Sequence, residues 1–198
     1  MEGQDTVSGD FSGLFGLTQD MGADDDGTDA SLSYSLSIGE GLTATGLSSD
    51  GNPITLAMDG DDIVGQTTVG AEVTDIFRIS VDNTEGNEGK VTLTQYAEID
   101  HVGELLDDDA FNNDVNNLGL PDGSILLKAS ATITDGDEDS ASDDETVDIS
   151  DSFSFDDNGP TVSVAEDTTF DAPSLTTQDA ETIGADSDMA SGDFSGLF

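Results

Sequence analysis

Cysteine and tryptophan are absent from this 198-residue chain, and only three of its residues are basic. Without cysteine, no disulfide and no thiolate metal site can form. The net charge of −42 excludes nucleic acid as an ordinary partner, because a phosphate backbone attracts positive charge. No apolar run approaches the roughly 18 residues of a membrane span, so we expect no membrane insertion. A chain this anionic compacts only with cations, supplied by divalent ions outside a cell or by the very high salt of a halophile.

Residues suited to catalysis are equally scarce. His101 is the single histidine, and without a G-x-S-x-G elbow there is no nucleophile–base pair. We expect Asp100 and His101 to form a surface turn pair. Spacing alone leaves paired carboxylates for glycosidase chemistry open, but two tyrosines offer little surface on which a sugar could stack. The chain is therefore predicted not to be an enzyme.

Alternation of apolar and polar residues dominates what is present. It predicts seven or eight short strands separated by turns, with Phe77, Ile79 and Val81 facing inward. This pattern is typical of an all-β fold, an antiparallel Ig/cadherin-like β-sandwich with long acidic loops. Gly103–Leu120 does not alternate and is predicted to be a long loop with a short helical turn. The expected strands are Ser31–Ile38, Ile54–Met58, Ile63–Val64, Ile76–Val81, Val91–Ile99, Ile125–Ile133, Val147–Ile149 and Phe153–Phe155.

One octapeptide occurs twice. Ser8–Phe15 (SGDFSGLF) recurs letter for letter as Ser191–Phe198, a period of 183 residues. The simplest account is one full repeat of a tandem array followed by the opening of the next. We therefore expect a β-sandwich repeat module over residues 1–158, and a linker with the start of the next repeat over 159–198. Whether residues 159–198 hang free or add a strand to an exposed edge of residues 1–158 is open at this point.

The densest group of possible metal ligands lies between two predicted strands. Asp135, Asp137 and Asp139 have the 1, 3 and 5 spacing of an EF-hand loop, and carboxylate oxygens are the donors that Ca²⁺ prefers. The rest of an EF-hand is missing, because Ser140 replaces its glycine and Thr146 its closing glutamate. We predict a Ca²⁺-binding D-x-D-x-D loop, with a merely solvated acidic turn as the alternative.

A second group of oxygen donors lies at the predicted module boundary. Asp156, Asp157 and Asn158, together with Glu166 or Asp167, could hold Ca²⁺, although Asp and Asn are also ordinary turn residues. The acidic runs at residues 24–29 and 107–109 are predicted to be solvated loops.

Three stretches together resemble the tandem repeats (extender domains) of giant RTX adhesins, the type I-secreted surface proteins of Gram-negative bacteria. They are the repeated DFSGLF element, Thr132–Ser142 (TITDGDEDSAS) and Ser152–Thr161 (SFSFDDNGPT). The likeness covers nearly the whole chain. It departs from the family pattern at Glu138, where glycine is commoner, and at Asn158, which is inserted before Gly159. The DNGP of residues 157–160 also resembles the Asp-Asn-Ala-Pro junction of cadherins, where Ca²⁺ rigidifies the link between modules.

This resemblance implies an extracellular, cell-surface protein that depends on Ca²⁺ and serves cell adhesion or biofilm formation. It implies a structural spacer repeat whose partners are the neighbouring repeats of the same polypeptide. Host or biofilm surface ligands would bind through other domains. The alternative function is an adhesive module that itself binds a glycan or a protein.

Overall fold

The computed structural model describes residues 5–22, 27, 29–100, 118–156, 164–178 and 189–197. The chain divides into two units, Met1–Asn158 and Gly159–Phe198. Within the described ranges the regular structure consists of β-strands and short 3₁₀ turns, without an α-helix. Accordingly, no helix among the described residues has the length and apolar character to cross a bilayer.

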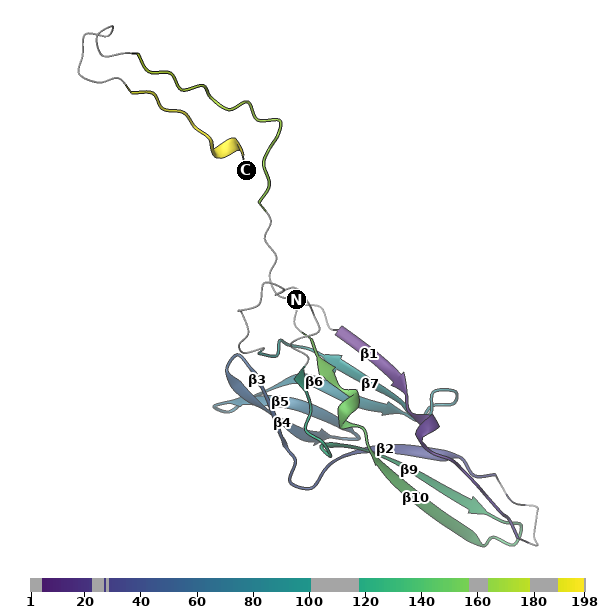
Figure 1. The fold of residues 1–198 in the computed structure, drawn as a ribbon. Coiled ribbons are helices and arrows are strands. Elements are labelled where there is room, and N and C mark those ends of the chain that lie inside the picture. The colour runs from purple at the N-terminus through teal and green to yellow at the C-terminus, as the bar shows by residue number, and fades with distance from the viewer. Residues whose placement is uncertain are drawn as a thin grey trace. The chain divides into compact units, whose positions relative to one another are not determined.

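All strands of the described chain lie in the first unit and pair antiparallel (Figure 1). A six-stranded sheet has the order β1-β7-β6-β5-β4-β3, a three-stranded sheet the order β10-β9-β2, and β11 pairs with β8. The prediction of an all-β, sandwich-like antiparallel fold is confirmed. The strands are β1 (Asp5–Asp10), β2 (Leu32–Ile38), β3 (Ala44–Ser49), β4 (Asn52–Asp59), β5 (Asp62–Val69), β6 (Glu72–Asp82), β7 (Lys90–Gln95), β8 (Leu118–Gly119), β9 (Ile125–Thr134), β10 (Ser140–Asp148) and β11 (Ser154–Phe155).

The core of the first unit is made by inward-facing side chains of both larger sheets. Leu36 and Leu127 from the three-stranded sheet belong to the same buried cluster as Ile63 and Ile79 from the six-stranded sheet. Burial of these aliphatic side chains contributes about 1.5–3 kcal/mol each. The core therefore depends on apolar packing and contains no charged group among its members.

A β-bulge modifies the alternation in β6. The register between β5 and β6 shifts between Gly65 and Gln66, so that Gly65 pairs with Phe77 while Gln66 pairs with Asp75. Ile76 is the extra residue, and both Ile76 and Phe77 are buried. A bulge places two successive side chains where strict alternation allows one, which is why the expected inward face missed Ile76.

Several strand boundaries differ from the sequence-based expectation. The predicted strand Ser31–Ile38 is confirmed as β2, and the predicted strands Ile54–Met58 and Ile63–Val64 belong to β4 and β5, which pair as a hairpin. Val91–Ile99 is shorter than expected, since β7 ends at Gln95. The exposed strand β1 and the half-buried strand β3 were not predicted, and β10 begins at Ser140 rather than Val147. Most of the predicted loop Gly103–Leu120, and its helical turn, lies outside the described residues.

Exposure explains why β10 was missed. Its sequence SASDDETVD carries charge at successive positions, and all of its residues except the half-buried Val147 are exposed. Such a strand has no apolar face by which its sequence could be recognised. It forms because β9 offers a complete edge for antiparallel pairing. Edge strands of natural sheets are commonly charged in this way, which discourages pairing with other chains.

Candidate metal centre

The Asp135–Asp139 loop joins β9 to β10 at the tip of a hairpin. The strands enter it in register, with Thr134 opposite Ser140 and their hydroxyls 2.9 Å apart. The loop is closed by the Asp135 N–H, which donates to the Asp139 carbonyl at 3.0 Å. The Asp139 N–H in turn donates to Asp135 Oδ1 at 2.9 Å. These bonds fold the five residues into a tight turn.

This turn brings three carboxylates together. One oxygen each from Asp135, Asp137 and Asp139 lies within 4.8 Å of the other two. Asp135 is half-buried, whereas Asp137 and Asp139 are exposed. Carboxylate oxygens at this spacing can converge on one hard cation, and backbone carbonyls and water would complete the six to eight ligands that Ca²⁺ takes.

Crowding of negative charge affects the pKa of Asp137. A hydrogen bond from its carboxyl to Asp135, and then the repulsion between the two charges, raises the pKa of Asp137 above its ordinary value. None of the ion pairs among the described residues involves this loop. The nearest part of the hairpin with a cation is Lys128 on β9, which pairs with Asp144 of β10 at 3.0 Å.

The backbone of the loop is strained at Glu138. Its φ of 76° lies in the left-handed region, which favours glycine. Glu138 is also one of the two positions at which this chain departs from the repeat pattern that it resembles. The left-handed backbone is therefore a conformational cost within the acidic loop.

A groove runs beside the loop on the three-stranded sheet. Its lining includes the apolar residues Leu32, Ala131 and Ile133 and the acidic residues Asp143 and Glu145. Its volume is about 480 Å³. A smaller cavity of about 150 Å³ shares Ile133 with it and is lined by Asp135 and Asp139. The groove thus combines apolar lining residues with carboxylates and continues toward the aspartate loop.

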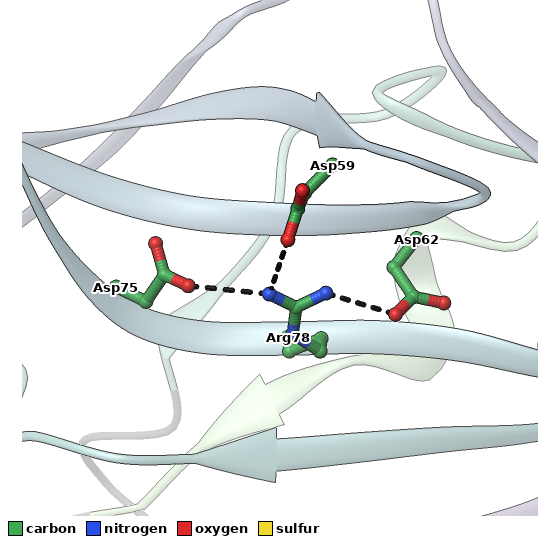
Figure 2. A network of polar contacts seen from close by, with 4 residues as sticks. All are labelled: Asp59, Asp62, Asp75 and Arg78. Carbon is green, nitrogen blue, oxygen red and sulfur yellow. Dashed lines mark hydrogen bonds and ion pairs between the residues drawn. The ribbon is translucent and has the colours of Figure 1, made fainter.

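A second cluster of three aspartates surrounds the single arginine (Figure 2). Arg78 on β6 contacts Asp59 at 2.6 Å, Asp62 at 2.9 Å and Asp75 at 3.3 Å. The hydrogen bonds that Arg78 donates to Asp59 and Asp62 raise the pKa of Arg78 above its ordinary value. Sequence reasoning missed this cluster. Its signal was available, because a lone arginine in so acidic a chain marks the place where protein itself supplies a counterion.

The predicted boundary site is only partly described. Asp156 is exposed and belongs to the first unit, whereas Glu166 is exposed and belongs to the second. Asp157 and Asn158 lie outside the described residues. Asp167, the alternative to Glu166, accepts hydrogen bonds from the Thr169 N–H at 2.9 Å and its hydroxyl at 2.7 Å. This group therefore stays a prediction.

Two other acidic residues have structural partners. Asp100 accepts hydrogen bonds from the Ser48 hydroxyl at 2.7 Å and from the Gly51 N–H at 2.8 Å. It therefore fastens the chain after β7 to the β3–β4 hairpin, while His101 lies outside the described residues. Asp29 accepts a bond from Gln19 Nε2 at 2.6 Å. The acidic runs 24–26 and 107–109 are also outside the described ranges.

Comparison with known proteins adds a family without an assigned activity. No curated protein matches the chain, and no solved structure matches it. A family model does match residues 1–150, which include β1 to β10 and the aspartate loop. The chain belongs to this family, described as a domain of unknown function (DUF5801).

Proposed function

We propose that this protein is a calcium-stabilised structural spacer repeat of a secreted bacterial cell-surface adhesin. The observation that carries the proposal is the convergence of Asp135, Asp137 and Asp139 at one hairpin tip, with their oxygens within 4.8 Å. The donor set fits Ca²⁺, which prefers carboxylate oxygens, and it offers neither the nitrogen nor the sulfur ligands that zinc selects.

The role of the ion would be electrostatic and mechanical. Bound Ca²⁺ offsets the repulsion among three carboxylates and ties β9 to β10 at the end of an edge hairpin. The exposed strand β10 has little apolar surface of its own, so its pairing with β9 depends more than most on the state of this loop. A stiff hairpin tip suits a module that transmits force along an array of neighbouring repeats.

Because Ca²⁺ is far more concentrated outside the cell than in the cytosol, a need for Ca²⁺ would make the protein fold outside the cell. Extracellular modules bind Ca²⁺ with dissociation constants of roughly 10⁻⁴–10⁻³ M, well above cytosolic levels. The chain would therefore remain poorly compacted inside the cell, where its net charge of −42 opposes collapse, and fold after secretion. We propose secretion by a type I route and a cell-surface location on the same grounds, together with the adhesin resemblance.

Calcium-dependent stability tests this function. The melting temperature should rise on Ca²⁺ titration and fall with EGTA. The corresponding gain in the free energy of unfolding is about 2.7 kcal/mol when the ion is a hundredfold above its dissociation constant. NaCl at matched ionic strength is the control, because a halophilic protein would respond equally to both. An unchanged melting temperature in Ca²⁺, or the same gain from NaCl, would contradict the proposal.

The groove beside the aspartate loop favours a second candidate, an adhesive module that binds a ligand directly. Its apolar lining is aliphatic except for Phe15, the single aromatic residue there. With acidic residues also in the lining, it suits a basic and apolar peptide segment of a protein better than a neutral glycan. Binding of Lys-rich peptides that weakens in Ala131→Lys, measured by calorimetry, would support this function. Binding unaffected by that change would reject it.

A further inference from the structure

The two copies of the octapeptide extend into a longer duplication that includes a whole strand. Asp5 aligns with Asp188, and nine of the eleven residues of Asp5–Phe15 are identical in Asp188–Phe198. The two differences are Thr6, which becomes Met189, and Val7, which becomes Ala190. The second copy therefore carries a counterpart of every residue of β1, four of the six identical, and the complete sequence of the turn that follows it.

Both copies form the same local structure although they lie in different units. Each contains an aspartate that accepts a backbone N–H two residues later, followed by a 3₁₀ turn, η1 (Ser12–Leu14) in the first copy and η3 (Ser195–Leu197) in the second. The octapeptide itself therefore encodes this turn, independently of the sheet. The bonds are Ser12 N to Asp10 Oδ1 (2.9 Å) and Leu14 N to Phe11 O (3.1 Å), and Ser195 N to Asp193 Oδ1 (2.9 Å) and Leu197 N to Phe194 O (3.1 Å).

The surroundings of the two copies differ. The first copy pairs with β7 over six residues, and the Phe11 N–H donates to the Gly89 carbonyl at 3.0 Å. Phe11 and Phe15 pack against the core, with the Phe15 ring 5.8 Å from Tyr34. In the second copy, Phe194 is 40% exposed, and residues 189–197 belong to none of the described sheets. This copy is held within its own unit instead, where the Asp167 N–H donates to the Leu197 carbonyl and Gly192 and Gly196 lie against Pro173 and Phe170.

We propose that the segment Met189–Leu197 of one copy of this chain docks on β7 of a second copy in place of β1. The register would be that of β1, which sets Met189 opposite Thr94 and Ser191 opposite Thr92. Because every residue of β1 is exposed, the exchange changes little beyond the two anchoring phenylalanines, and the incoming segment supplies Phe194 as the equivalent of Phe11. In the sequence Phe198, the counterpart of Phe15, follows directly after the segment. Exchange of an identical element is a low-cost route to association.

Competition from the resident strand controls how much exchange occurs. β1 is tethered to its own sheet, so it competes at an effective concentration of roughly millimolar. Exchange should therefore be weak in dilute protein and should increase when β1 loses its anchor. Phe11→Ala weakens the resident strand in the acceptor, whereas Phe194→Ala weakens the incoming segment in the donor. This association needs no calcium and is separate from the proposed spacer function.

Disulfide trapping between two full-length variants tests the exchange, since the natural chain has no cysteine. The acceptor carries Thr94→Cys and the donor carries Met189→Cys, and the two are mixed in a glutathione redox buffer with EGTA. The Thr6 and Thr94 hydroxyls are 3.4 Å apart, so residues in this register can bridge. We expect a crosslinked heterodimer, resolved by a size tag on one chain.

Three matched changes decide the outcome. A donor with Ala190→Cys projects from the opposite strand face and should crosslink several-fold less. Phe11→Ala in the acceptor should raise the yield, and Phe194→Ala in the donor should lower it. Equal yields from the 189 and 190 donors, or no heterodimer even at about 1 mM protein with the unweakened acceptor, would overturn the proposal.

Discussion

The two aspartate triads of this protein differ in where their counterion comes from. Asp59, Asp62 and Asp75 surround Arg78, with distances of 2.6 to 3.3 Å. Asp135, Asp137 and Asp139 have carboxylate oxygens within 4.8 Å of one another but take part in none of the described ion pairs. The first triad has its counterion within the protein, whereas the second, under the proposed function, would take a cation from solution. The difference separates an acidic cluster that stabilises constitutively from one that can respond to its surroundings.

The largest expected effect comes from removing the second triad. With Asp135, Asp137 and Asp139 all changed to Asn, the calcium-dependent gain of about 2.7 kcal/mol at a hundredfold excess over the dissociation constant should disappear. The charge repulsion disappears as well, so the variant should be no less stable than the natural protein in EGTA. Differential scanning calorimetry with and without Ca²⁺ measures both. A calcium response that survives the triple change would move the site elsewhere.

Removing the protein's own cation makes the first triad resemble the second. Arg78→Met should lower stability by about 1–2 kcal/mol at low salt, because three carboxylates lose their partner. Ca²⁺ should then restore part of the lost stability by binding the three unpartnered carboxylates. In the natural protein Arg78 already serves as their counterion. Lys128→Met is the control, since its single exposed pair with Asp144 contributes at most about 0.5 kcal/mol. Urea denaturation of the three proteins in Ca²⁺ and in EGTA provides the comparison.

A smaller gain is expected from relieving the backbone strain within the aspartate loop. Glu138→Gly should raise stability by about 0.5–1 kcal/mol, because glycine adopts a φ of 76° without penalty. It should also tighten calcium binding if the strained loop must relax to receive the ion. Asp50→Gly, at the other left-handed non-glycine residue with φ 49°, is the matched control. It should affect stability alone and leave calcium affinity unchanged.

Acid should affect the aspartate loop in two opposite ways. The pKa of Asp137 is raised in the folded protein, so the folded state binds more protons than the unfolded state between the ordinary value of 3.8 and the raised one. Its contribution to stability is therefore present at low pH and is lost as pH rises through the raised pKa. Calcium affinity should move the other way and fall as Asp137 becomes protonated. Carboxyl titration by NMR in EGTA checks both signs, and Asp137→Asn should abolish this contribution.

The sequence could predict what depends on alternation, and little of what depends on pairing. β2 and the β4–β5 hairpin were expected because Tyr34, Leu36, Ile54 and Leu56 lie on one face of their strands and are buried. β1 is different, since all its residues are exposed and only the edge of β7 makes it a strand. The inward orientation of Ile76 was not predicted, because it results from a bulge in the pairing of β6 with β5 and not from the alternation of neighbouring residues.

The candidate metal loop was predictable because its spacing is local. Three aspartates at alternate positions between two strands lie close together in any tight hairpin. The lone Arg78 marks an ion-pair cluster in the sequence, but its partners could not be named, because Asp59 and Asp62 reach it only after β4 and β5 pair beside β6. Contacts across 16 and 19 residues depend on strand order, which composition does not reveal.

Gly65 restricts how the strands of the six-stranded sheet can align. A side chain at this position would collide with the ring of Phe77 on the neighbouring strand, which lies directly over the glycine. Sliding β6 by one residue would bring that ring against a residue with a side chain, so misaligned sheets are rejected by steric overlap alone. The alignment of the six-stranded sheet is therefore set by side-chain shape, whereas cations would determine whether so anionic a chain compacts at all.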